Sequence, residues 1–69
     1  MANINLLRAK MAEAGCINFI TELAEILQIS RGAASLKMNN KSPFKQAEIK
    51  ALADKYEMTP EDIQKIFVN

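Results

Sequence analysis

The 69-residue sequence has no histidine, no tryptophan, one cysteine, and only two glycines and two prolines. Histidine is the side chain that ordinarily titrates near neutral pH, so its absence excludes catalytic triads and zinc sites that depend on it. The single cysteine, Cys16, cannot form an internal disulfide, which favours a reducing, cytoplasmic location. The sequence therefore predicts neither an enzyme nor a protein that binds a metal or another cofactor.

Long apolar runs are also missing. No stretch approaches the roughly 18 continuous apolar residues of a membrane span, and residues 1–10 lack the order of a signal peptide. A chain of 69 residues has room for one small core. We therefore expect one domain over 1–69, without a deep cleft or a separate oligomerisation domain.

The net charge of +1 hides an uneven distribution. Between residues 31 and 50 there are five cations and one anion, a balance of +4, whereas the remainder has four cations and seven anions, a balance of −3. Such a basic segment is either a surface that attracts the phosphates of a nucleic acid or an ordinary solvated surface. Its cations are Arg31, Lys37, Lys41, Lys45 and Lys50.

Apolar residues recur at helical spacing, and no segment has the sustained alternation of a strand. The pattern predicts an all-α fold with five short helices, over 5–14, 19–27, 31–38, 45–56 and from residue 60 onward. Gly15 follows the first helix, where a positive φ suits glycine. Asn18, Ser30 and Thr59 are the predicted N-caps of the second, third and fifth helices, and Pro60 suits the first position of the fifth.

The segments 19–27 and 31–38, with a three-residue turn between them, form a candidate helix-turn-helix. Ala24 and Ala34 are small enough to let the two helices approach closely, and Ile29 can anchor the turn in the core. The predicted core consists of the inward positions of the five helices and the turn: Leu7, Met11, Leu23, Ala24, Leu27, Ile29, Ala34, Ile49, Leu52, Ala53, Ile63 and Ile66.

The run 22–31, ELAEILQISR, resembles the ELAxxLxIS-R core of the Cro/C1-type (XRE-like) helix-turn-helix family, which contains phage repressors and Cro proteins. The segments 35–41, 44–49 and 59–63 also resemble parts of that family, so the likeness covers nearly the whole chain. It implies a lambda-repressor-like domain, a phage or prophage Cro-like transcriptional regulator that reads operator DNA with the helix 31–38. The chain departs from the pattern in four ways. The spacing from Gly15 to Leu23 is one residue longer than usual, and Ile20 stands where glutamine is usual. Asn40 stands where glycine is usual, and Gly32 where relatives often have a base-reading polar side chain.

The resemblance places the DNA-binding residues in and around the helix 31–38. Arg31 either grips O6 and N7 of a guanine or is an ordinary surface arginine. Leu36 meets a thymine methyl if it points outward and is core if it points inward, and Lys37 is either a phosphate contact or a solvated lysine. The full predicted set is Arg31, Gly32, Ala33, Ser35, Leu36, Lys37, Asn39, Asn40, Lys41, Lys45, Gln46 and Asn18.

The remaining members of this set are expected to hold the DNA backbone. Ser35 can donate to a phosphate or a base, and the loop residues 39–41 can bind phosphate while also forming a turn. Lys45 and Gln46 begin a helix, whose free N–H groups suit a phosphate. Asn18 either contributes to a similar phosphate site at the start of the helix 19–27 or only caps that helix.

One recognition helix covers only a few base pairs, so a homodimer on a near-palindromic operator is expected, at least on DNA. Phe67 and Val68 offer apolar surface that predicts contact between two copies. Alternatively, Phe67 folds back onto Leu7 or Tyr56 and closes the core of the monomer. A second class of function also stays open, because the weakly polar helix 31–38 suits a small adaptor or antitoxin-like module that binds protein and not DNA.

Overall fold

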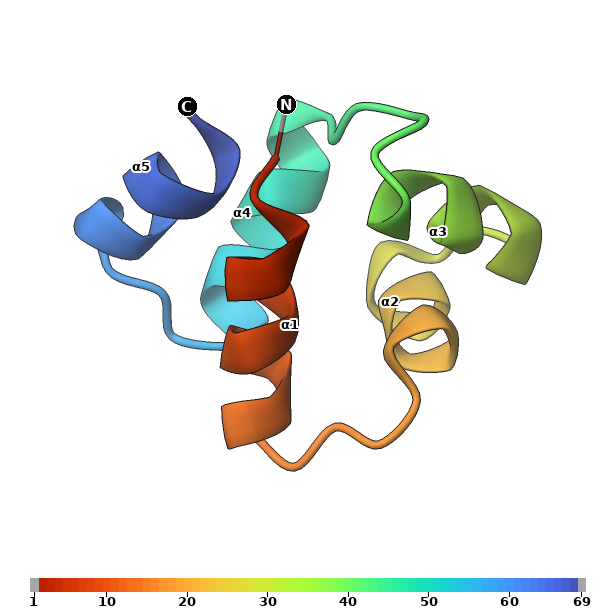
Figure 1. Cartoon of the computed structure of the whole chain (residues 1–69), viewed down its shortest axis with the longest axis horizontal. Coiled ribbons are helices and arrows are strands. Elements are labelled where there is room, and N and C mark those ends of the chain that lie inside the picture. Colours follow the sequence, from red (N-terminus) through yellow and green to blue (C-terminus); the bar gives the residue numbers. More distant parts are fainter. Residues whose placement is uncertain (1, 69) are drawn as a thin grey trace.

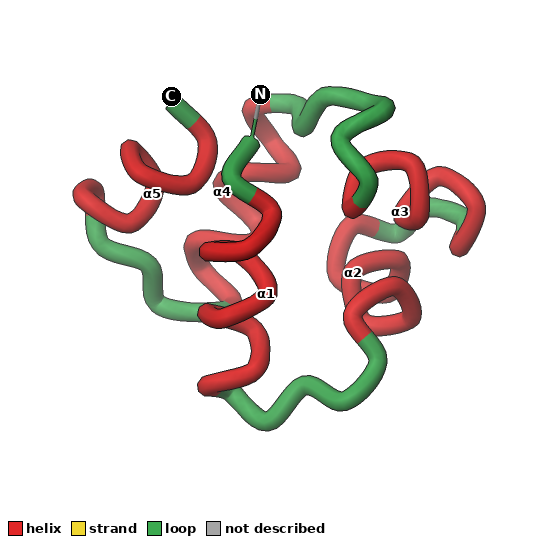
Figure 2. Tube along the Cα trace, viewed as in Figure 1, coloured by secondary structure: helices red, strands yellow, loops and turns green. Residues whose placement is uncertain are grey.

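The computed structural model describes residues 2–68, which form five α-helices and no strand (Figure 1). Short loops connect the helices, as Figure 2 shows. The all-α prediction is confirmed, and so are the predicted bounds of the second and third helices. In chain order the helices are α1 (Ile4–Glu13), α2 (Phe19–Leu27), α3 (Arg31–Met38), α4 (Gln46–Lys55) and α5 (Pro60–Phe67).

Side-chain caps fix where the helices begin. Oδ1 of Asn18, Oγ of Ser30 and Oγ1 of Thr59 each accept a backbone N–H from three residues further on, at 3.1 Å. The three predicted N-caps are therefore confirmed. The start of α1 was predicted one residue late because its cap, Asn3, lies before the apolar stripe; Oδ1 of Asn3 accepts from the N–H of Leu6.

Three predicted helix boundaries lie one residue too far out. Ala14 is the C-cap of α1 and not its last residue. Lys45 is the N-cap of α4 and not its first residue, and its N–H donates to Oε1 of Glu48 at 2.8 Å. At the other end, Tyr56 is the C-cap of α4, and Glu57 follows with a φ of 50°. Gly15 has a φ of 86° after α1, as predicted.

All five helices contribute side chains to one core. α2 packs against α3 and α4, and α5 packs against α1 and α4; Figure 1 places α3 and α5 at opposite ends of the longest axis. Most predicted core residues are buried: Leu7, Met11, Leu23, Ala24, Ala34, Leu52 and Ile66. Leu27, Ile29, Ala53 and Ile63 are half-buried and pack against them, and the core also includes Met38, Tyr56 and Met58.

Ile49 is the exception among the predicted core residues. It is half-buried and lies outside the core cluster, where it lines a pocket beside Phe44 and Phe67. Helical spacing alone placed it on the same stripe as Leu52, but the stripe is wider than the face that α4 buries. Within residues 2–68, no helix is both long enough and apolar enough to cross a lipid bilayer.

A polar contact joins α2 to the C-terminal end of α4. The hydroxyl of Tyr56, whose ring is buried, donates to the carboxylate of Glu22. Burial and this carboxylate raise the pKa of the Tyr56 hydroxyl, and the same two causes raise the pKa of the Cys16 thiol. Both groups are therefore uncharged near neutral pH, and the contact holds α2 in place beneath α3.

Residues 2 and 3 run between α5 and the end of α3. The N–H of Asn3 donates to the carbonyl of Ile66 at 2.6 Å. The carbonyl of Ala2 accepts from the side-chain amide of Asn40 at 2.8 Å. The start of the described chain is thus hydrogen-bonded to both the last helix and the loop that follows α3.

Candidate nucleic-acid interface

The helix-turn-helix has the geometry that the sequence predicts. Gln28 ends α2 with a φ of 55°, and the N–H of Ile29 donates to the carbonyl of Ala24 at 3.0 Å. Ala24 and Ala34 are both buried where α2 and α3 meet. Small side chains at this contact let α3 lie close to α2 while its other face stays uncovered (Figure 1).

That uncovered face of α3 carries five of the predicted site residues. Arg31, Gly32, Leu36 and Asn39 are exposed, and Ser35 is half-buried. At 100° per residue these positions span less than half of the helix circumference, so they form one continuous face. Leu36 points outward, with 49% of its surface exposed, so the alternative that it belongs to the core is wrong. Ala33 lies at the edge of the face and is half-buried.

Lys37 does not lie on this face, and both predicted alternatives, a phosphate contact and a solvated lysine, are wrong. Its side chain is buried, with Nζ 2.9 Å from Oε1 of Glu48 and donating to the carbonyl of Pro43 at 2.7 Å. Nζ also lies 5.7 Å from the centroid of the Phe44 ring. The ammonium is fully used inside the molecule, so it is not available to a ligand.

The carboxylate of Glu48 is the centre of this buried cluster. It accepts from the Lys45 N–H as well as pairing with Lys37. Burial alone would raise the pKa of Glu48, but the Lys45 N–H and the Lys37 ammonium outweigh it and hold the pKa below its ordinary value of 4.5. Near neutral pH the cluster is therefore a true ion pair that joins the end of α3 to the start of α4.

The C-terminal end of α3 is closed by its own backbone. The N–H of Asn40 donates to the carbonyl of Lys37 at 3.1 Å, and the N–H of Lys41 donates to the carbonyl of Leu36 at 2.8 Å. Asn40 has a φ of 58°, the left-handed conformation that this pair of bonds requires. Asparagine thus fills the position at which the resembling family has glycine, and it fixes where Lys41 leaves the helix.

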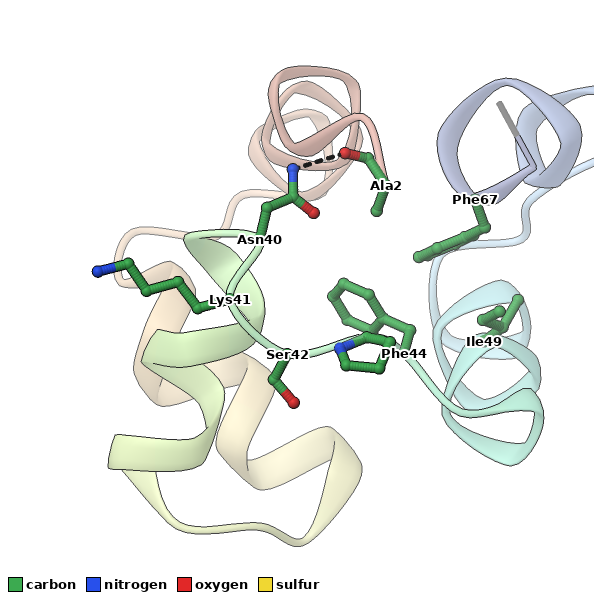
Figure 3. A pocket seen from close by; sticks show the side chains of 8 residues that line it. Ala2, Asn40, Lys41, Ser42, Phe44, Ile49 and Phe67 are labelled. Carbon is green, nitrogen blue, oxygen red and sulfur yellow. Dashed lines mark hydrogen bonds between the residues drawn. The ribbon is translucent and has the colours of Figure 1, made fainter.

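The side-chain amides of Asn39 and Asn40 are also used within the chain. Nδ2 of Asn39 donates to the carbonyl of Ser35 at 2.8 Å, and that of Asn40 donates to Ala2. Both side chains therefore stabilise the end of α3. This is the turn-forming role that the sequence analysis gave as an alternative to DNA contact. Lys41 is different, because it is exposed and extends into solvent (Figure 3).

Behind the loop lies a pocket of about 360 Å³, open to solvent (Figure 3). The rings of Phe44 and Phe67 meet there edge to face, with centroids 5.2 Å apart. Ala2, Pro43 and Ile49 complete its apolar lining. The side chain of Lys41 points away from the pocket, so one side of the loop is anchored on apolar groups and the other side presents charge.

The exposed charge of this region is positive. Lys37 and Glu48 cancel each other inside, so the balance of +4 over residues 31–50 rests on exposed Arg31, Lys41, Lys45 and Lys50. Lys50 pairs with Asp54 at 3.9 Å, but both side chains are exposed and such a pair is weak. Gln46 is exposed at the first position of α4, and Asn18 is exposed where it caps α2.

These features define an all-α domain of five helices in which α2 and α3 form a helix-turn-helix. A family model described as the BetR domain matches residues 4–65, and the chain belongs to this family. No curated protein and no solved structure matches the chain.

Proposed function

We propose that this protein binds double-stranded DNA at a specific operator and regulates transcription in the cytoplasm, as a Cro-like phage or prophage repressor. The observation that supports this most is the uncovered face of α3, which presents Arg31 and is flanked by exposed lysines. A helix is narrow enough to enter the major groove, where each base pair offers a distinct pattern of groups.

The proposal gives each group a separate task. Arg31, at the start of α3, reads a guanine edge. Lys41 and Lys45 contact phosphates on either side of the groove, and the N-terminus of α4 adds free N–H groups. The buried pair of Lys37 and Glu48 keeps these two phosphate-binding elements at a fixed distance from α3.

Replacing Arg31 with alanine tests the reading of bases. We expect the Arg31→Ala variant to bind its operator more weakly by about 1–3 kcal/mol and to lose its preference at one base pair. The operator would first be selected from a random duplex library, and affinities measured by fluorescence anisotropy. Lys55→Ala is the control, because Lys55 is an exposed residue at the other end of α4. Equal affinities for the Arg31→Ala variant and the wild type would remove Arg31 from the interface.

Replacing Lys41 with alanine tests contact with phosphate. The Lys41→Ala variant is expected to weaken binding to all duplexes alike and to reduce the slope of log K against log salt by about one. The measurement is a titration of the same duplex at several salt concentrations. A slope that does not change would show that Lys41 has no phosphate partner.

A homodimer on DNA is part of the proposal. Phe67 is already packed against Phe44, so Val68, at 57% exposure, is the better candidate for contact with a second copy. Val68→Ser is expected to reduce cooperative binding to an operator with two half-sites and to leave thermal stability unchanged. Cooperativity equal to that of the wild type would exclude this end of the molecule from the dimer contact.

A second candidate is a protein-interaction module, which the exposed Leu36 favours. An apolar residue in the middle of an uncovered helix face can equally well meet a partner protein. The salt titration above separates the two functions, because only DNA binding is expected to weaken steeply with salt.

A further inference from the structure

The uncovered face of α3 offers few groups that could read a base. The Lys37 ammonium points inward, and the side-chain amide of Asn39 donates to a carbonyl of its own helix. Arg31 provides the one long donor group on the face, and Ser35 adds a half-buried hydroxyl. The large apolar side chain exposed on this face is that of Leu36.

Gly32 has no structural reason to be glycine. Its φ is not in the left-handed region, and a Cβ built there would meet only Oγ of Ser30, at an ordinary 4.0 Å. Glycine inside a helix is less favourable than alanine, so the fold would tolerate or prefer alanine at this position. The free space in front of Gly32 is therefore available to something outside the chain.

Gly32 and Leu36 lie one helical turn apart on the same face. Long side chains in a helix lean toward the N-terminal end, so the side chain of Leu36 leans over position 32. With no Cβ at Gly32, the methyl groups of Leu36 stay uncovered, in line with its 49% exposure. Next to Arg31, the two residues form a shallow apolar step, in which the missing side chain of Gly32 leaves a depression and the Leu36 side chain forms its edge.

We propose that this step receives the C5-methyl group of a thymine, so that Leu36 and Gly32 specify thymine in the major groove while Arg31 specifies guanine. The inference rests on the proposed function. The exposed cations on either side of α3 are complementary to phosphate, which favours DNA over a protein as the partner of this surface. Thymine alone presents a methyl group in the major groove.

The helix geometry also gives the spacing. Five residues separate Arg31 from Leu36, which is about 7.5 Å along the helix axis. Base pairs are stacked at about 3.4 Å, so the thymine is expected about two base pairs from the guanine that Arg31 contacts.

The test removes single methyl groups from the DNA. In the half-site selected from a random library, each thymine is replaced in turn by deoxyuridine, and the affinity is measured by fluorescence anisotropy. We expect one position, about two base pairs from the conserved guanine, at which the wild-type protein binds about fourfold more weakly. The Leu36→Ala variant is expected to bind the duplex with thymine and the duplex with deoxyuridine at that position equally. Leu6→Ala is the matched control, because Leu6 is also exposed, at 41%, but lies on α1.

Gly32→Ala separates binding from folding. Alanine is expected to raise the melting temperature, yet to weaken operator binding several-fold and abolish the discrimination against deoxyuridine. The inference is overturned if no thymine is sensitive to loss of its methyl, if Leu36→Ala keeps the full discrimination, or if Gly32→Ala binds as tightly as the wild type. If no duplex sequence is selected at all, the proposed function itself fails.

Discussion

The Lys37→Met variant is expected to lose about 3 kcal/mol of its free energy of unfolding at neutral pH. Methionine retains the length and apolar stem of lysine but removes the ammonium. The Glu48 carboxylate, 12% exposed, would then keep the Lys45 N–H but lose its cation, and the carbonyl of Pro43 would lose its donor. Uncompensated buried charge is among the few causes of a destabilisation this large.

Urea denaturation, followed by the helical circular dichroism signal, measures this loss. Lys50→Met is the matched control, because its ion pair with Asp54 lies on the surface and is expected to contribute less than about 0.5 kcal/mol. A loss no greater in Lys37→Met than in Lys50→Met would show that the buried pair does not hold α3 to α4.

The same pair predicts how stability depends on pH. The pKa of Glu48 in the folded protein lies below its ordinary value of 4.5, so the folded state holds on to the ionised form. This stabilisation is complete above pH 4.5 and is lost as the pH falls through the lower, folded-state pKa. In Lys37→Met the carboxylate lacks its cation, so the difference between wild type and variant is expected to shrink on acidification.

The Leu23→Ala variant is expected to lose about 3 kcal/mol. Leu23 lies in the middle of α2, and its side chain is completely buried. Alanine would remove apolar contacts and leave a cavity beneath α3, since helices held by backbone hydrogen bonds relax only in part. A domain of this size has a total stability of roughly 3–10 kcal/mol, so a loss this large would leave a substantial unfolded fraction at physiological temperature.

Leu36→Ala serves as the comparison for this variant. The chemical change is the same, but Leu36 is half exposed, and alanine is a good helix former. We expect its stability to stay within about 0.5 kcal/mol of the wild type in the same urea experiment. If Leu23→Ala were as stable as Leu36→Ala, the assignment of Leu23 to the core of the fold would be wrong.

Local interactions explain why so much of the fold could be predicted. Asn18 and Ser30 cap the helices that follow them through hydrogen bonds to residues only three positions away. The starts of α2 and α3 can therefore be predicted from neighbouring residues in the sequence. Lys37 could not be placed in the same way. Its partner, Glu48, belongs to the next helix, and in the sequence an inward lysine looks like an outward one.

The candidate site was predicted in outline but not in detail. The sequence marked α3 and its basic flanks, and it left open whether Leu36 faces in or out. Whether a polar side chain already has a hydrogen-bond partner within the protein depends on contacts between distant segments, such as the hydrogen bond from the Asn40 amide to the carbonyl of Ala2. The structure shows that the fold does not require glycine at position 32, and the sequence could not show this because it does not reveal the space around the residue.

The hydrogen bonds of residues 2 and 3 have a consequence for the order of folding. The helices and their caps depend on neighbouring residues, but Asn3 can meet Ile66 only after residues 3–66 have been synthesised. Bringing together segments so distant in sequence carries the largest loop-closure entropy in the molecule, so this junction is expected to form late. Because Ala2 also holds Asn40, the loop that presents Lys41 reaches its final position only with that last step. The loop that carries Lys41 is therefore expected to reach its final position after α2 and α3 have packed together.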